Sequence, residues 1–120
     1  MKFGFTTLFT DKIEETTAFY RDVLGFELYQ ELSPAPGIKI AFLKNGGSRL
    51  EILQNDHSPV VDNSKSSIQL TFLVDNIDNA YAEMKEAGVQ SVSELMILPS
   101  GLQMFNSRDP NGVALGFVKE

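Results

Sequence analysis

Apolar and polar positions follow two different periods along this chain, and the same succession of periods occurs twice. Phe3 to Thr10 is rich in aromatic and β-branched residues, which favour a strand. From Ile13 to Leu24 the apolar spacing is helical, and Gly25 can end that helix in the left-handed conformation. Thr10 or Asp11 is expected to cap the helix through its side-chain oxygen. The chain therefore begins with a strand and a helix.

Three further strands are predicted after this helix. They cover residues 26–32, 38–43 and 49–54. Residues 33–37 contain two prolines, which cannot lie in a central ladder, and are expected to form a loop. Asn45-Gly46-Gly47 can adopt positive φ and predicts a hairpin turn. The first module is βαβββ.

The second half of the chain repeats this order after a polar stretch, residues 55–67, which reads as a linker or as a loop over a binding site. Residues 68–74 predict a strand, and Asp75 or Asn76 is expected to cap a helix from about Ile77 to Ala87. The remaining predicted strands are 91–98, 102–106 and 113–119, with a tight turn at 109–112.

The two halves match in register, because Thr10-Asp11-Lys12-Ile13 aligns with Val74-Asp75-Asn76-Ile77 at an offset of 64 residues (75 − 11). A repeat of this length indicates a structural duplication. We expect one domain over residues 1–120, with module one at 1–54, a linker at 55–67 and module two at 68–120.

Composition narrows the class of protein. The chain has 120 residues, 42% apolar content and a net charge of −6, which is ordinary for a globular protein. No run approaches the roughly 18 apolar residues that cross a membrane, and the N-terminus does not resemble a signal peptide. The absence of cysteine excludes disulfides and thiolate sites, and fits a cytoplasmic protein. Without a basic patch, we expect neither nucleic acid nor a membrane as partner.

The order of motifs resembles the glyoxalase/bleomycin-resistance/extradiol-dioxygenase superfamily, also called the vicinal oxygen chelate fold. The resemblance rests on Ala-Phe-Tyr-Arg-Asp-Val-Leu-Gly-Phe-Glu-Leu at 18–28, Phe-Leu-Val-Asp-Asn at 72–76 and Asp-Pro-Asn-Gly at 109–112. It implies an α+β fold, in which two βαβββ modules form a curved, open mixed sheet with helices on the convex side. It also implies a ligand on the concave face and a homodimer.

Many enzymes of that superfamily bind a divalent metal through the first and last strands of each module. The resemblance places the four ligand positions at Phe5, Glu51, Gln69 and Gly116. Only Glu51 is an ordinary ligand, and a catalytic site generally needs about three. We therefore expect no metal and no other cofactor. His57 is either a surface histidine, the interpretation we favour, or a residue that swings over the concave face.

Alternation along the strands divides the side chains between two faces. Leu8, Ile52, Ile68 and Phe72 are expected to face the helices. The ligand-binding residues expected on the concave face are Phe5, Thr7, Phe9, Glu51, Gln69, Thr71 and Gly116. The phenylalanines either stack on a planar ligand or fill the cavity as a closed core, and both interpretations stay open.

Three functions follow. The leading hypothesis is a binding protein without catalytic residues that sequesters a small aromatic or cationic compound, similar to the antibiotic-binding resistance proteins. The second is a metal-dependent lyase, isomerase or dioxygenase with a divergent site built from Glu51, Gln69 and His57. The third is a dimeric interaction module without a ligand. The sequence identifies neither the ligand nor whether the modules pair within a chain or exchange between chains.

Overall fold

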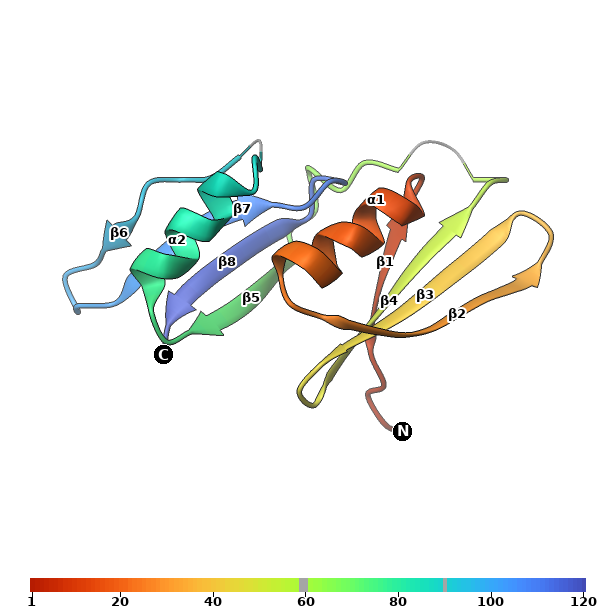
Figure 1. Ribbon diagram of the computed structural model, residues 1–120, viewed down its shortest axis with the longest axis horizontal. Helices are drawn as coiled ribbons and strands as arrows, with labels where there is room; N and C mark the ends of the chain where they lie inside the picture. Colours follow the sequence, from red (N-terminus) through yellow and green to blue (C-terminus); the bar gives the residue numbers. More distant parts are fainter. Residues whose placement is uncertain (59–60, 90) are drawn as a thin grey trace. The chain divides into compact units, whose positions relative to one another are not determined.

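The computed structural model describes residues 1–58, 61–89 and 91–120, and the chain divides into two compact units, Met1–Val61 and Asp62–Glu120. The boundary falls inside the predicted linker. Each unit has a helix lying across one face of its own four-stranded sheet (Figure 1). Within the described ranges, neither helix has the length and apolar character of a membrane-spanning segment.

The first unit is built in the predicted βαβββ order, and its sheet is open and mixed. Its strand order is β1-β4-β3-β2, with β1 parallel to β4 and the other neighbours antiparallel. The elements are β1 (Thr6–Thr10), α1 (Ile13–Ala18), a π-helical turn η1 (Phe19–Val23), β2 (Glu27–Ala35), β3 (Ile38–Asn45) and β4 (Ser48–Asn55).

The second unit repeats this topology, which confirms the duplication and the α+β class. Its strand order is β5-β8-β7-β6, with β5 parallel to β8. The elements are β5 (Gln69–Val74), α2 (Ile77–Glu86), β6 (Met96–Ile97), β7 (Gln103–Arg108) and β8 (Ala114–Lys119). The side-chain oxygen of Asn76 accepts a hydrogen bond from the backbone N–H of Asn79 at 3.0 Å and so caps α2. Of the two predicted caps, Asp75 and Asn76, the structure selects Asn76.

The start of the first helix differs from the prediction. Lys12 is the residue before the helix and makes no side-chain cap, so the predicted cap at Thr10 or Asp11 is wrong. The first helical N–H, that of Ile13, donates instead to the side-chain oxygen of Gln54 at 2.8 Å. Gln54 belongs to β4, so a distant strand satisfies the helix terminus, and local sequence could not reveal this contact.

β2 is longer than predicted, because the strand continues through Pro34 to Ala35. The loop predicted at 33–37 shrinks to the turn at Pro36 and Gly37. Proline is tolerated here because β2 is the edge strand of the sheet and the pairing with β3 shifts register between Leu32 and Ala35.

The strand predicted over 91–98 is also wrong in extent. Only Met96–Ile97 form a strand, with an isolated bridge between Val92 and Ser107. The hydroxyl of Ser93 accepts a hydrogen bond from the backbone N–H of Asn106 at 2.9 Å, and the hydroxyl of Ser107 donates to the carbonyl of Ser91 at 2.7 Å. Serine hydroxyls therefore bond to backbone groups that would pair with each other in a regular ladder.

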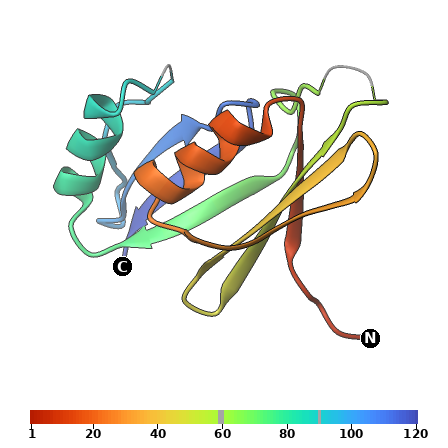
Figure 2. The same cartoon turned by 45° about the vertical axis from the view of Figure 1, so that its right-hand side comes forward.

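The predicted alternation holds along the central strands of both sheets. In the first unit these strands, β3 and β4, are antiparallel and joined by a hairpin (Figure 2). Leu50 and Ile52 are buried beneath α1, and Leu115 and Phe117 are buried in the second unit. On β5, Gln69, Thr71 and Leu73 are exposed while the intervening residues are half-buried. Ile68 is an exception: it precedes β5, is 69% exposed, and does not pack beneath a helix as predicted.

Candidate functional site

The helix-free face of each sheet, meaning the face opposite its helix, contains the residues predicted to bind a ligand. In the first unit, β1 and β4 run side by side with Thr7 opposite Glu51. The hydroxyl of Thr7 donates to Oε1 of Glu51 at 2.7 Å, and both residues are half-buried. This bond fixes one oxygen of the carboxylate, and the other oxygen remains available to a hydrogen-bond donor or a cation.

Aromatic side chains lie on the same face as this carboxylate. The ring of Phe5 contacts that of Phe42 edge to face, with 5.5 Å between centroids. Phe42 lies opposite Glu51 in the ladder between β3 and β4. Phe9 shares the face and is 54% exposed. The structure thus places Phe5, Thr7, Phe9 and Glu51 on one exposed face of this unit.

Sequence reasoning missed Phe42 and Tyr29, which extend this aromatic surface. Their centroids are 6.2 Å apart, and the Lys44 ammonium lies 5.5 Å from the Tyr29 centroid, within reach of a cation–π contact. The period-two alternation of residues 38–43, paired with Glu51 across the hairpin, could have identified Phe42. Tyr29 could not be found this way, because the ladder shifts register between Leu28 and Gln30.

In the second unit, Gln69, Thr71 and Gly116 form one cluster. Thr71 lies opposite Gly116 in the β5–β8 ladder. The amide nitrogen of Gln69 donates to the hydroxyl of Thr71 at 3.1 Å. The Gln69 amide extends over Gly116 so closely that a Cβ at position 116 would collide with its nitrogen. The Gln69 side chain therefore fills the space next to Gly116.

A polar cleft of about 500 Å³ adjoins Gln69 on this unit. Its charged member is Arg108, which sequence reasoning did not single out. Arg108 Nη1 donates to the carbonyl oxygens of Gly112 at 2.8 Å and Ser64 at 3.2 Å. Arg108 lies opposite Ala114 in the ladder between β7 and β8, and Ala114 is two residues before Gly116. Alternation along the strands could therefore have identified Arg108 on the same face as Gly116. The cleft is lined by Gln69, Ser91, Val92, Ser93, Asn106, Ser107, Arg108, Ala114 and Leu115.

The turn at 109–112 has a structural role, which is to hold the end of the linker. Oδ1 of the buried Asp109 accepts hydrogen bonds from the backbone N–H groups of Asn111 at 2.7 Å and Val113 at 2.9 Å. The carbonyl of Asn111 then accepts from the N–H of Asn63 at 3.1 Å. In the same linker, hydrogen bonds from Ser64 lower the pKa of the Asp62 carboxyl.

His57 is exposed and lies against the turn between β2 and β3. Its ring nitrogen Nε2 is 3.3 Å from the carbonyl oxygen of Pro36, and the ring closely approaches Gly37. Its backbone N–H donates to the side chain of Asn55 at 3.0 Å. The structure therefore places His57 on a turn at the end of the first sheet, where it does not meet Glu51.

The metal that the family resemblance implies does not fit the donors in this structure. The four corresponding positions hold an aromatic ring, a carboxylate engaged by Thr7, an amide engaged by Thr71 and a glycine. In the part of the chain that the structure describes, no three histidine, cysteine, aspartate or glutamate residues gather closely enough to bind a metal ion. A site with about three strong donors is therefore not assembled by these side chains.

Comparison with known proteins supports the same family. Residues 2–117 match the Glyoxalase/Bleomycin resistance protein/Dioxygenase superfamily. The chain is 29% identical over 91 residues to mitochondrial methylmalonyl-CoA epimerase from Mus musculus. That match covers 68% of this chain but only 51% of the epimerase, so the chain spans about half the length of this curated relative.

Two solved structures share the fold over almost the whole chain. The glyoxalase family protein from Enterococcus faecalis is 26% identical, with a TM-score of 0.80 and coverage of 98% of this chain and 96% of that one. TnmS3, an antibiotic binding protein from Streptomyces sp. CB03234, is 19% identical, with a TM-score of 0.72 and coverage of 99% and 96%. The match of residues 2–117, together with the sequence motifs and the repeated βαβββ topology, shows that the chain belongs to the Glyoxalase/Bleomycin resistance protein/Dioxygenase superfamily.

Proposed function

We propose that this protein binds a small organic ligand on its helix-free faces without a metal ion, as a drug-binding or sequestering member of its superfamily. The observation that carries the proposal is the replacement of the metal ligand at three of the four positions, Phe5, Gln69 and Gly116. Phe5 offers an aromatic surface, and Gln69 covers Gly116. Such positions suit an organic ligand better than a metal ion, because apolar walls with a few polar groups are typical of small-molecule sites.

The preferred ligand is a planar aromatic cation. Phe5 and Phe42 present ring edges and faces beside the Glu51 carboxylate, and Thr7 holds that carboxylate in place. A cation that stacks on these rings can pair with the free oxygen of Glu51. The fold supports this proposal by example, since TnmS3 is described as an antibiotic binding protein.

A thermal-shift and fluorescence titration with proflavine tests this proposal, with neutral acridine as the comparison ligand. We expect proflavine to stabilise the protein, and Glu51→Gln to weaken its binding about tenfold, as loss of a charge-assisted hydrogen bond does. Phe5→Ala should weaken both ligands. Glu83→Gln, an exposed residue on α2 with the same change of charge, is the control. Equal binding by the wild-type and Glu51→Gln proteins would contradict the assigned role of Glu51.

Metal analysis of the purified protein provides an independent test. We expect no bound ion and no thermal shift with zinc, nickel, manganese or iron(II). About one ion per chain, with stabilisation, would overturn the metal-free proposal and favour an enzyme with a rebuilt site.

The apolar side chains on the helix-free faces also support a homodimer. On these faces Phe9 is 54% and Leu73 64% exposed, and Phe3, which precedes β1, is 85% exposed. Apolar surfaces of this kind commonly mark interfaces, and small modules gain buried area by pairing. Sedimentation equilibrium should give twice the chain mass, and a monomer at all concentrations would refute the dimer. A dimer that binds none of the ligands would favour the interaction-module hypothesis.

A second candidate function is an isomerase, because the curated relative is methylmalonyl-CoA epimerase. Glu51 is the carboxylate that the first unit presents for proton transfer. Incubation with methylmalonyl-CoA in deuterium oxide should then introduce deuterium next to the thioester, and Glu51→Gln should abolish the exchange. No exchange above a blank reaction would exclude this candidate.

A further inference from the structure

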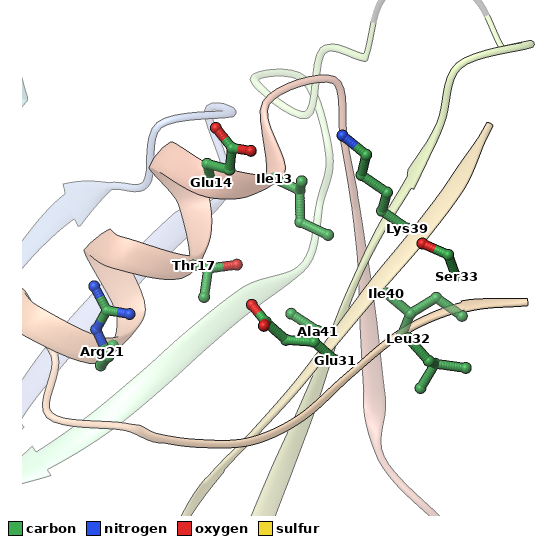
Figure 3. Close-up of a pocket in the computed structure, with 10 residues that line it drawn as sticks. All are labelled: Ile13, Glu14, Thr17, Arg21, Glu31, Leu32, Ser33, Lys39, Ile40 and Ala41. Atoms are coloured by element: carbon green, nitrogen blue, oxygen red, sulfur yellow. The ribbon is translucent and has the colours of Figure 1, made fainter.

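The first unit has a cleft on the side of its sheet that faces the helix, away from the residues discussed above. The cleft has a volume of about 630 Å³ and lies between α1 and the strands β2 and β3 (Figure 3). Its walls include Ile13, Thr17 and Arg21 on the helix side and Glu31, Lys39 and Ala41 on the strand side.

The cleft exists because two small residues occupy positions that are aromatic in the other half of the repeat. Thr17 and Ala41 correspond, at the offset of 64, to Tyr81 and Phe105. In the second unit these two rings fill the space between helix and sheet, with centroids 5.2 Å apart. The same fold therefore closes this space in one unit and leaves it open in the other.

The floor of the cleft is formed by small or apolar side chains of the buried core. Ala41 is 2% exposed and Ile13 is 8% exposed. Thr17 is nearly buried, and Figure 3 shows its side chain directed into the cleft from α1. An occupant must therefore have an apolar body, of about the size of the aromatic side chains that fill the equivalent space in the second unit.

Charged groups of both signs surround this floor. Glu31 extends from β2 toward Thr17 (Figure 3). Lys39 precedes Ala41 by two residues on β3, so it lies on the same face, about 7 Å further along the strand. Neither residue belongs to either ion pair found in the described part of the chain. The Arg21 guanidinium donates to both carboxylate oxygens of Asp22, at 2.8 and 3.0 Å. The pKa of Arg21 is raised mainly by Asp22 and also by the charge of Glu31, so the guanidinium is shared between these two carboxylates.

We propose that this helix-side cleft binds a small zwitterion with an aromatic body, of the class of a free aromatic amino acid. The ring occupies the floor at Thr17 and Ala41. The Glu31 carboxylate accepts hydrogen bonds from the ammonium of the ligand, and the Lys39 ammonium pairs with its carboxylate. The site is separate from the helix-free faces, so it goes beyond the proposed function and does not depend on it.

An NMR titration with three related probes tests both charges. The probes are phenylalanine, phenethylamine, which lacks the carboxylate, and 3-phenylpropionate, which lacks the ammonium. We expect phenylalanine at millimolar concentration to shift the backbone amide signals of α1, β2 and β3. Each partial probe should bind about tenfold more weakly than phenylalanine, since it loses one charge-assisted contact.

Substitutions then assign each contact. Glu31→Gln should weaken phenylalanine and phenethylamine but leave 3-phenylpropionate unchanged, and Lys39→Gln should do the converse. Both residues are exposed, so these variants are expected to fold. Ala41→Phe, which copies the second unit, should abolish binding of all three probes. Glu83→Gln is the control for a lost surface carboxylate.

Two results would overturn the proposal. One is the absence of amide shifts from all three probes. The other is a set of shifts confined to β1 and β4 around Glu51, which would place the aromatic compound on the helix-free face. That second result would favour the proposed function while refuting the helix-side site, so the two proposals fail separately.

Discussion

The substitution Gly116→Ala tests the arrangement on which the metal-free interpretation depends. A Cβ at position 116 would collide with the amide nitrogen of Gln69 and lie 3.0 Å from its Cδ and 3.5 Å from Oγ1 of Thr71. The obstructing atoms belong to the end of an exposed, flexible side chain, not to backbone. Gln69 can therefore swing away, at the cost of its hydrogen bond to Thr71.

The net effect on stability should be small, because two terms oppose each other. Losing the exposed hydrogen bond costs about 0.5–1.5 kcal/mol. Replacing glycine in a strand interior by alanine contributes about 0.5–1 kcal/mol. We expect the free energy of unfolding of Gly116→Ala to lie within about 1 kcal/mol of wild type. In a Gln69→Ala background the collision is absent, and Gly116→Ala should stabilise the protein by about 0.5–1 kcal/mol.

Urea unfolding followed by circular dichroism measures all four members of this double-mutant cycle. Gly112→Ala is the contrast: φ there is +83°, and the new Cβ would lie 3.0 Å from the backbone nitrogen of Ser64. Because backbone cannot swing aside, that variant should lose at least about 2 kcal/mol. A loss above about 2 kcal/mol for Gly116→Ala in both backgrounds would refute the reasoning, since Gln69 would not be the obstructing group.

Three further predictions each concern one hydrogen-bonded contact; urea unfolding tests the first two and an NMR titration tests the third. Thr7→Val removes the donor to Glu51 and should lower the unfolding free energy by about 1 kcal/mol. Thr7→Ser keeps a hydroxyl donor and should lose much less. An equal loss in both variants would exclude the hydroxyl as the cause. Asp109→Ala leaves two buried backbone N–H groups without their acceptor and should lower the unfolding free energy by about 2–4 kcal/mol. Asp109→Asn keeps an acceptor oxygen and should lower it clearly less. A similar loss for both variants would contradict this account. Hydrogen bonds from Arg21 lower the pKa of the Asp22 carboxyl below its ordinary 3.8, so this contact stabilises the fold above the unfolded pKa and is lost as the pH falls through the folded pKa. An NMR titration of Arg21→Gln should find the pKa of Asp22 closer to 3.8. An unchanged pKa would rule out Arg21 as the cause.

Sequence reasoning succeeded where one local period or one repeat determined the outcome. The alternation on residues 69–74 placed Gln69 and Thr71 together, and the offset of 64 residues anticipated two units with the same strand order. It failed where a distant element decided the structure. β2 continues through Pro34 because it is an edge strand, and the N–H of Ile13 is capped by Gln54 of β4.

The amino-acid sequence by itself determined the family, the duplicated βαβββ order and the loss of three of the four metal-ligand residue types, because these depend on residue identity and spacing. Only the tertiary structure showed that the Gln69 amide fills the space at Gly116 and that His57 lies on a turn apart from Glu51. It alone revealed the helix-side cleft, although Thr17 and Ala41 are plain in the sequence. A cavity depends on how side chains from elements distant along the chain pack together, and no local sequence pattern shows whether they fill the space between a helix and a sheet.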